Sequence, residues 1–451
     1  MQSYFFPYIG YFQLIASVDR MILYENLNHI RHGWVHRNRI RIKGRDAVYC
    51  SVPLLHASSS VKIRDLLVDP AQRWPGKFLN LLAFNYKKAR FFDEVYPVIE
   101  EAVSRETARL ARRGHGVRVY SMRHYGALDP EYRGMRVVGV PSIPLAACEK
   151  VSASIASVLH ASMSSWADIL HLHSVGPGFM GWLPRLRRKP AVVQFHGIEW
   201  RRARWSRFGS AVLKSLERAT VRCNRRFTAV SETQCAYLRD TYGIEARCIP
   251  GGADVKTAPE PRELLALGLE PRRYALFASR LVREKGAHYL VEAFRRLDTT
   301  DRLVIAGDVP GAAAYRDELR RLAGDDSRIV WPGFVQGRLL EELVGHARVY
   351  VQPSDLEGLS LALLEAMGYG TCCLASDIPE NVEALGDAGA TFRRGDAGDL
   401  AAKLRTLMGD PAAAAAYGAR AVARIREHFS WDRVADAFEG FYREIARPVS
   451  S

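Results

Sequence analysis

The sequence predicts an α/β protein with two doubly wound parallel sheets, and two observations carry this prediction. From about Arg105 onward, short apolar segments alternate with longer stretches of helical periodicity, which is the pattern of strand and helix repeats in parallel sheets. The alternation is interrupted once, at residues 257–268, which indicates a connector between two domains. The first hundred residues lack the alternation, so we expect them to form a separate N-terminal part, residues 1–103.

The first doubly wound domain is assigned to residues 104–256, with strands expected at 117–122, 135–141, 169–173, 192–196, 227–230 and 247–250. The second is assigned to residues 257–430, with strands expected at 274–279, 303–307, 329–331, 349–352 and 372–375. Phe429 to Trp431 begins a last helix, and residues 431–451 are expected to cross back to the first domain. Ligands of such sheets bind beyond the carboxyl ends of the strands, so we expect the site there.

One helix start in the second domain carries the strongest signal for a ligand. Two carboxylates, Glu357 and Glu365, stand around a turn that follows an expected strand and opens a helix. Ser360 is expected to cap this helix, which leaves three amides as unpaired donors, those of Gly358, Leu359 and Ser360. A helix end of this kind attracts a diphosphate, and a carboxylate inside the helix suits ribose hydroxyls. The alternative interpretation is an ordinary amphipathic helix with two surface acids.

A second loop supplies positive charge. Arg280 and Lys285 flank the loop between an apolar strand and the helix expected over residues 286–297. Arginine offers a fork of donors and lysine a point charge, and both can reach the same phosphates. Such charge neutralises a leaving nucleoside diphosphate when no metal is present.

These two loops, together with the segments 303–308, 331–335, 351–354 and 375–381, resemble the C-terminal half of family 4 glycosyltransferases. That family consists of retaining enzymes of the GT-B fold, in which two Rossmann-like domains face each other. The resemblance implies a nucleotide-sugar donor. It also implies roles in donor binding or at the reacting carbon for Arg280, Lys285, Gly307, Val335, Glu357, Gly358, Leu359, Ser360 and Glu365.

The upstream half agrees with this resemblance. Residues 169–174 and 191–197 are typical of buried parallel strands that end in polar residues. A lone histidine at a strand end is more often structural than catalytic, but His196 resembles the family's active-site histidine, which contacts the donor sugar beside the reacting carbon. His171 and His173 have no third ligand at a usable spacing, and the family is usually metal-independent. We therefore expect no metal and no cofactor at this site.

The first hundred residues carry other motifs, at 1–15, 33–40, 51–53 and 86–97. These resemble about the first half of the WbqC-like family, whose members are associated with bacterial surface-polysaccharide gene clusters. Within this part, residues 36–39 indicate an exposed Arg-rich strand, and a polar binding cluster is the alternative. The resemblance favours an acceptor in O-antigen or another surface polysaccharide.

Two pieces of the expected architecture are missing at the junction. Family 4 glycosyltransferases open with a strand and a Gly-rich loop before a helix that resembles Arg105–His115, whereas Val98–Val103 precedes that helix here without a glycine. The first strand of a doubly wound sheet lies at its centre. Either Arg20–Tyr24 supplies a substitute strand or the first domain is incomplete. An incomplete domain would leave a fusion that binds nucleotide without turnover, and a GT-B sugar-nucleotide epimerase is a third interpretation.

The composition limits where in the cell the protein is expected and which partners it is expected to bind. The chain has 451 residues, a formal charge of +15 and seven cysteines, with no apolar run of the roughly 20 residues that a membrane span needs. An odd cysteine count without a Cys-x-x-Cys motif fits a reducing compartment, and the amino-terminal segment lacks the features of a signal peptide. We therefore expect a cytoplasmic protein.

The excess of positive charge is compatible with nucleic acid, an anionic membrane or anionic substrates. Basic residues concentrate at 185–226, where Trp200, Trp205 and Phe208 alternate with arginines. This suits a peripheral contact with the inner face of the cell membrane as well as a solvated basic face. No nucleic-acid-binding motif occurs, so the expected partners are a nucleotide-sugar donor and a glycan or lipid-linked acceptor. The base, the sugar and the acceptor are not specified by the sequence.

Overall fold

The computed structural model describes residues 109–111, 113–122, 131–132, 135–143, 149–201, 206–308 and 313–446, together with four short strands before residue 69. The chain forms two compact units, Met1–Glu94 and Val95–Ser451. In the first unit, β1 (Arg37–Ile40) pairs antiparallel with β2 (Val48–Ser51), and β3 (Leu54–Leu55) pairs with β4 (Leu67–Val68). The strand expected at 36–39 is confirmed as β1. The segments 1–15, Arg20–Tyr24 and Val98–Val103 lie outside the described residues.

The C-terminal half of the second unit contains a six-stranded parallel sheet of order β14-β13-β12-β15-β16-β17. Its strands are β12 (Tyr274–Ala278), β13 (Arg302–Ala306), β14 (Ile329–Gly333), β15 (Val349–Gln352), β16 (Cys372–Ser376) and β17 (Ala390–Phe392). In order of appearance this is 3-2-1-4-5-6, the order of a doubly wound sheet. The direction of winding therefore reverses between β12 and β15, which is where such folds bind ligands.

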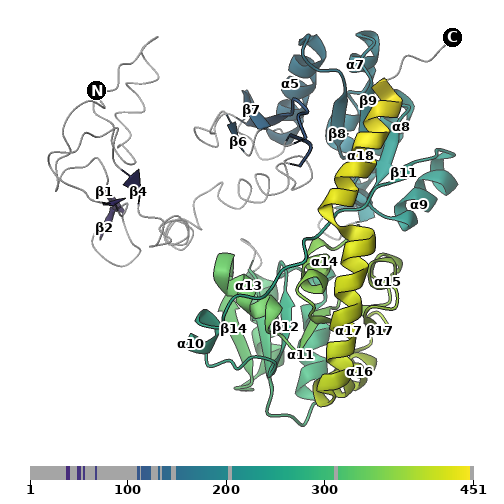
Figure 1. Cartoon of the computed structure of the whole chain (residues 1–451). Coiled ribbons are helices and arrows are strands. Elements are labelled where there is room, and N and C mark those ends of the chain that lie inside the picture. Colours follow the sequence, from purple (N-terminus) through teal and green to yellow (C-terminus); the bar gives the residue numbers. More distant parts are fainter. Residues whose placement is uncertain are drawn as a thin grey trace. The chain divides into compact units, whose positions relative to one another are not determined.

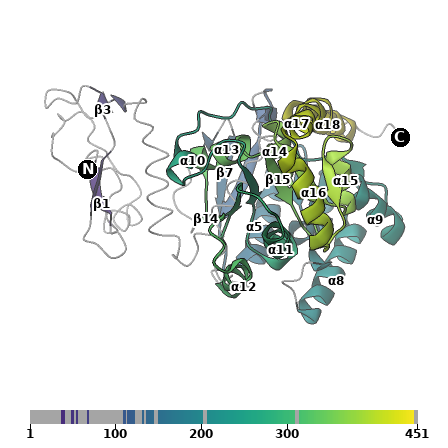
Figure 2. The ribbon, with the colours of Figure 1, turned by 90° about the horizontal axis from the view of Figure 1, so that it is seen from below.

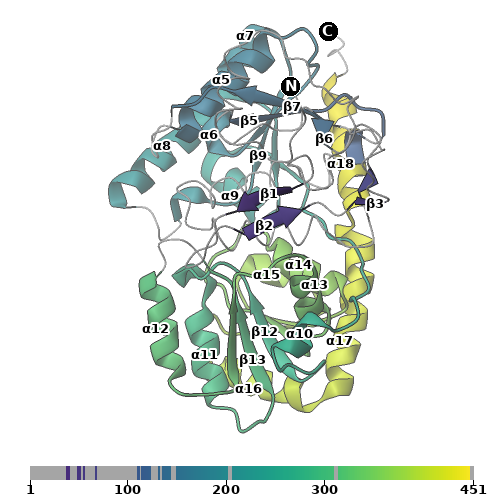
Figure 3. The ribbon, with the colours of Figure 1, turned by 90° about the vertical axis from the view of Figure 1, so that its left-hand side faces the viewer.

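Helices cover both faces of this sheet. One apolar core lies under α11 (Ala287–Arg295), α12 (Ala313–Ala323) and α16 (Ala397–Gly409). The other lies under α10 (Glu263–Ala266), α13 (Gly337–Gly345), α14 (Leu361–Gly368) and α15 (Pro379–Leu385). Figure 2 shows α11, α12 and α16 on one side of the sheet and α10, α13 and α14 on the other, and Figure 3 shows α11 beside α12. The predicted two-layer covering of a doubly wound domain is confirmed.

The N-terminal half of the second unit divides its strands between two sheets. One has the order β5-β7-β6 and the other β11-β10-β9-β8. The strands are β5 (Arg118–Met122), β6 (Glu131–Tyr132), β7 (Met135–Val140), β8 (Leu170–His173), β9 (Ala191–Phe195), β10 (Phe227–Ala229) and β11 (Arg247–Cys248). In the described part of the chain, no strand pairs with the outer edge of β5 or of β8. This break falls where the sequence lacks the expected central strand.

The helices around these sheets are α5 (Glu149–Met163), α6 (Val175–Gly178), α7 (Trp182–Leu186), η4 (Glu199–Arg201), α8 (Arg207–Cys223) and α9 (Glu232–Tyr242). Their core joins apolar residues of β8, β9 and β10 to α5 and α9. At the end of the chain, α17 (Pro411–Arg424), a short π-helical turn (Ile425–Phe429) and α18 (Trp431–Ala446) follow one another, in yellow in Figure 1. Phe438 of α18 packs on His171, so this last helix contacts the first domain.

Candidate active site

The two predicted loops meet at the carboxyl ends of β12 and β15. A 3-10 turn, η5 (Arg283–Lys285), follows β12, and its Lys285 Nζ lies 2.6 Å from Glu357 Oε1 in the loop after β15. Both side chains are shielded, with 12% of Lys285 and 7% of Glu357 exposed. The same carboxylate oxygen accepts hydrogen bonds from Gln352 Nε2 and Ser354 Oγ, each at 2.7 Å. Glu357 is therefore fixed in one orientation by three donors.

Backbone contacts hold the two loops together. The Asp355 amide donates to the Glu284 carbonyl oxygen over 2.8 Å. Gly286 has a φ of +70°, and a Cβ atom there would stand 1.8 Å from the Pro353 carbonyl oxygen. A side chain at Gly286 would thus push the loops apart, which explains why a glycine follows Lys285.

Arg280 and Gly307 lie close to each other but outside the Lys285 and Glu357 pair. Arg280 is exposed at the end of β12, and none of the described residues forms an ion pair with it. Gly307 follows β13 with a φ of +144°, and a Cβ atom there would stand 1.9 Å from the carbonyl oxygen of Ser279, the residue before Arg280. The guanidinium of Arg280 is thus available to a ligand at the edge of the site.

The start of α14 has the predicted cap. Ser360 Oγ accepts a hydrogen bond from the Leu363 amide over 3.3 Å, so the expectation for Ser360 is confirmed. None of the described residues accepts a hydrogen bond from the amides of Gly358, Leu359 or Ser360. Glu365 lies half-buried in the second turn of α14, while Val335 and Leu359 pack against the core beneath that helix. The helix end is thus free to receive an anion.

His196 of the first domain lies against this loop of the second. A Cβ atom on Gly358 would stand 2.0 Å from the His196 carbonyl oxygen and 2.9 Å from Gln234 Nε2. Glu383 of α15 adds a second contact between the domains, because its carboxylate accepts from the Glu232 amide over 2.7 Å. The structure therefore brings His196, Glu357 and the start of α14 together.

A row of three histidines leads away from His196. His173 Nδ1 is 3.0 Å from His196 Nε2, and the two rings are stacked with centroids 5.2 Å apart. The His171 and His173 rings are stacked as well, at 4.3 Å. His171 Nδ1 in turn lies 2.6 Å from the hydroxyl oxygen of Tyr442 on α18.

All three rings are neutral at neutral pH. Desolvation by the surrounding protein, followed by the nearby His171, lowers the pKa of His196 to about 4. Desolvation also lowers the pKa of His173 to about 3, with His196 as the second cause, although His173 as a whole residue is exposed. Burial, and then His173, keep the pKa of His171 well below its usual value. A hydrogen bond between neutral His173 and His196 requires one ring to donate and the other to accept, so their tautomers are linked.

Sequence reasoning missed several of these contacts. Tyr442 is 271 residues from His171, and no local pattern connects them. Gln234 is 3% exposed, and neither polar atom of its amide has a partner among the described residues. No motif identified from the sequence includes Gln234.

The basic region contains exposed apolar side chains and a half-buried tryptophan. Leu186 and Phe208 are 71% and 80% exposed, on α7 and α8. Trp200 instead turns inward, where its indole Nε1 lies 3.3 Å from the Tyr237 hydroxyl. Trp205 lies outside the described residues. No helix in the described part of the chain is both long and apolar enough to cross a membrane.

Two cavities lie away from the predicted residues. One of about 440 Å³ is bounded by α11 and the start of α16 and includes Tyr289 and Arg394. The other, of about 340 Å³, includes Arg226, Arg247 and Phe441. None of the predicted site residues lines either cavity. The candidate site is therefore defined by the contacts between its residues.

Three family models match the chain. The WbqC-like protein family matches residues 2–115, Glycosyltransferase Family 4 matches 99–257, and Glycosyl transferases group 1 matches 272–410. Among similar proteins is the alpha-maltose-1-phosphate synthase of Mycobacterium tuberculosis, 29% identical over 64% of this chain and 82% of that protein. The D-inositol 3-phosphate glycosyltransferase of Xylanimonas cellulosilytica is 28% identical over 75% of this chain and 89% of that protein.

A third relative is the lipopolysaccharide core biosynthesis mannosyltransferase LpcC of Rhizobium leguminosarum, 30% identical over 42% of this chain and 56% of that protein. Among solved structures, the sucrose-phosphate synthase from Thermosynechococcus elongatus has a TM-score of 0.66 and 22% identity, covering 75% of this chain and 91% of that one. HepE from Anabaena, in complex with UDP, has a TM-score of 0.58 and 18% identity, covering 69% and 87%. At these identities the structural likeness concerns the fold alone.

Proposed function

Residues 99–257 and 272–410 are the two halves of a GT-B glycosyltransferase that follows a WbqC-like segment, and from this we propose that the chain is a retaining, metal-independent transferase. Its reaction would move a sugar from a nucleotide-sugar donor to a hydroxyl group of a glycan or lipid-linked acceptor. The observation that carries this proposal is the contact between Lys285 and Glu357 at the point where the sheet reverses its winding, with His196 beside it.

The donor roles follow from charge and position. Lys285 and the exposed Arg280 would neutralise the diphosphate, and the free amides of Gly358, Leu359 and Ser360 would hold its oxygens at the positive end of α14. Gly307 and Val335 would line the same site, and Glu365 would accept from the ribose hydroxyls. Glu357 and His196 would contact the sugar at the reacting carbon.

The chemistry balances without a protein nucleophile. The bond between the sugar's anomeric carbon and the phosphate oxygen breaks as the acceptor oxygen bonds to that carbon on the same face. The acceptor's proton passes to the leaving phosphate, which departs as a nucleoside diphosphate. Because the leaving diphosphate gains one further negative charge as this bond breaks, the cationic side chains and amides stabilise the transition state more than the ground state.

The acceptor is proposed from two separate hints. The WbqC-like segment and the likeness to a lipopolysaccharide core mannosyltransferase favour an envelope glycan, such as O-antigen. The basic helices with exposed Leu186 and Phe208 favour an acceptor at the cytoplasmic face of an anionic membrane. Binding to anionic vesicles, compared with a Phe208→Ser variant, tests the second hint.

A combined binding and turnover experiment tests the proposal as a whole. Calorimetry with UDP, GDP, ADP and dTDP would identify the base, and nucleotide-sugar donors of that base would then be assayed with and without a lipid-extract acceptor. Product formation that depends on the acceptor, with the donor's anomeric configuration retained by NMR, supports the proposal. An inverted product contradicts the retaining mechanism, and a product that forms without an acceptor indicates an epimerase or hydrolase instead.

A second candidate function rests on the divided sheet of the first domain. No described strand joins β5 to β8, and a protein without that central strand could bind nucleotide without building an acceptor site. The same calorimetry separates the two candidates. Tight nucleoside diphosphate binding without any transfer favours this nucleotide-binding fusion.

A further inference from the structure

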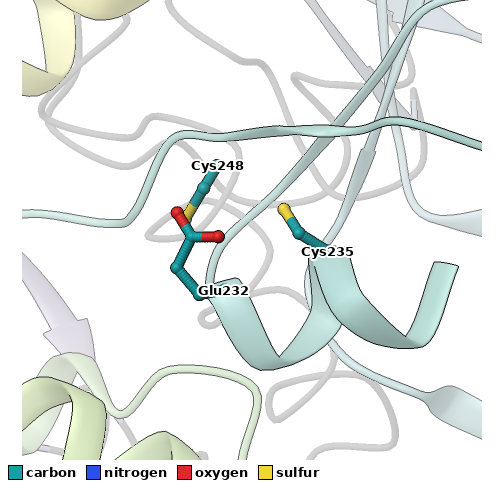
Figure 4. Close-up of side chains that lie close together, drawn as sticks. All are labelled: Glu232, Cys235 and Cys248. Atoms are coloured by element: carbon teal, nitrogen blue, oxygen red, sulfur yellow. The ribbon is translucent and has the colours of Figure 1, made fainter. Parts of the chain in front are cut away.

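Two thiols and one carboxylate converge on the first domain, away from the donor loops. Glu232 and Cys235 stand on the first turn of α9, and Cys248 stands on β11. One oxygen or sulfur atom from each lies within 4.8 Å of the corresponding atom of the other two. Figure 4 shows the three side chains directed toward one another from two separate elements.

Local structure explains why these side chains meet. Ser231 caps α9 by accepting from the Gln234 amide, so the helix begins at Glu232. Cys235 follows three positions later and therefore lies on the same face of the helix as Glu232. The helix ends at Gly243, whose left-handed φ of +66° turns the chain back toward the sheet. The returning strand pairs with β10, and this register puts Cys248 opposite Ala229, two residues before the Ser231 cap.

We propose that Glu232, Cys235 and Cys248 bind one divalent cation of zinc type, with solvent as the fourth ligand. Zinc prefers tetrahedral sites of thiolate, imidazole and carboxylate ligands, with bonds of about 2.0 to 2.3 Å. Tetrahedral bonds of that length put the ligand atoms about 3.3 to 3.8 Å apart. A separation of 4.8 Å would have to shorten by about 1 to 1.5 Å to reach these values, which rotations of the side chains supply.

Burial and charge are consistent with an open three-ligand site. Cys235 is 6% exposed, Cys248 is half-buried and Glu232 is exposed, so a bound cation would have protein on one side and water on the other. The Glu383 carboxylate, bonded to the Glu232 amide, adds negative charge nearby. Arg239 is the opposing cation on the same helix, but it lies 3.8 Å from Glu245 and both are largely exposed.

The carboxylate favours a metal over a disulfide. Two thiols alone would suit either outcome, and in a reducing compartment disulfides are rare. A disulfide would leave the position of Glu232 without a role, whereas a cation uses all three groups. The cation would join α9 to β11 next to the Glu383 contact with the second domain, so its effect would be to stabilise the first turn of α9.

The experiment uses the full-length chain, freed of metal and kept reduced with a phosphine. Zinc is titrated in competition with a chromogenic chelator, and Co²⁺ is used as a spectroscopic probe of thiolate ligation. We expect one equivalent of zinc, a thiolate-to-cobalt charge-transfer band and a rise in Tm on zinc addition. Cys235→Ser and Cys248→Ser should abolish all three, and Cys223→Ser, which changes a half-buried cysteine on α8, should abolish none.

A variant of the exposed ligand Glu232 tests the site without replacing a buried residue, so misfolding does not confuse the result. Glu232→Gln changes a surface residue and should weaken zinc binding at least tenfold. Replacing a residue that only hydrogen-bonds to a metal ligand already lowers metal affinity by about 10- to 100-fold. Equal zinc affinity in the wild type and in the Cys235→Ser, Cys248→Ser double variant would overturn the proposal. So would a reduced wild type that binds no zinc but forms the Cys235 to Cys248 disulfide when an oxidant is added.

Discussion

His173 Nδ1 and His196 Nε2 lie 3.0 Å apart at the carboxyl ends of two neighbouring strands, β8 and β9. Their rings are tilted by only 17° to each other, so the contact orients the plane of His196 and links its tautomer to that of His173. The carbonyl group of His196 also lies against Gly358. His196 is therefore held in place by His173 of the first domain and by Gly358 of the second. His173 is thus a positioning residue for His196.

Replacing His173 tests this positioning role. His173→Phe keeps a ring in place but removes the hydrogen bond to His196. We expect kcat to fall about two- to tenfold with little change in KM, since such a bond contributes about 0.5 to 1.5 kcal/mol. His173→Gln, which can still donate, should recover part of the loss. NMR of the imidazole nitrogens should show a mixture of His196 tautomers in the phenylalanine variant. A single unchanged tautomer would argue against the positioning role.

The histidine row also predicts how stability depends on pH. The pKa values of His171, His173 and His196 are all lowered from 6.5 in the folded protein, to about 3 for His173 and about 4 for His196. Between about pH 4 and 6.5 the unfolded chain therefore binds more protons, and the free energy of unfolding falls as the pH drops through this window. Above pH 7 these groups contribute their full stabilisation.

Urea denaturation between pH 7.5 and 5 measures this dependence. His171→Phe should make the decline shallower, because one fewer ring must stay neutral in the folded state. The pKa of His288 is also lowered, chiefly by burial, and a His288→Gln variant separates its contribution. A stability that does not change between pH 7.5 and 5 would contradict the expectation.

Gly358 offers a steric test of the contact between the domains. A methyl group in Gly358→Ala would lie 2.0 Å from the His196 carbonyl oxygen, so the loop and His196 must separate. We expect transfer activity to fall at least tenfold while secondary structure is unchanged. Gly440→Ala is the matched control, because nothing lies within 4 Å of a Cβ there, and alanine within α18 should be neutral or stabilise by up to about 1 kcal/mol. Equal activity in both variants would refute the contact.

Glu383 acts as a cap on a helix of the other domain. Its two carboxylate oxygens accept from the Glu232 amide at 2.7 Å and the Thr233 amide at 3.3 Å. Glu383→Ala should lower the free energy of unfolding by about 1 kcal/mol, the usual cost of losing an N-terminal cap. Glu245→Ala, which removes an exposed carboxylate 3.8 Å from Arg239, should cost close to nothing. Denaturant unfolding of both variants in the presence of a chelator gives the comparison.

The sequence was sufficient to predict that the loops of Lys285 and Glu357 lie together, because strand order determines which loops meet. Lys285 and Glu357 are 72 residues apart, yet each follows a buried strand, and β12 and β15 are neighbours at the reversal point of the sheet. Contacts that depend on the path of a loop or on a distant helix could not be predicted from the sequence. Cys248 joins Glu232 through the turn after α9, and Tyr442 reaches His171 from the last helix. The short strands β6 and β17 were not among the strands expected from the sequence.

Lys285 and Glu357 should have separable effects on the proposed reaction. Lys285→Ala removes the charge that would meet the diphosphate, so donor turnover should fall by a hundredfold or more and nucleoside diphosphate binding should weaken, with the fold intact. Glu357→Gln keeps partners for Gln352 and Ser354 but frees Lys285 from its ion pair, so diphosphate affinity should be kept or raised while turnover is lost. Calorimetry with the matching nucleoside diphosphate and a transfer assay measure the two effects separately. The exposed Arg316→Ala variant, on α12, is the control for a general loss of positive charge. If Lys285→Ala and Arg316→Ala bind and turn over the donor equally well, the ammonium group of Lys285 has no part in holding the phosphates.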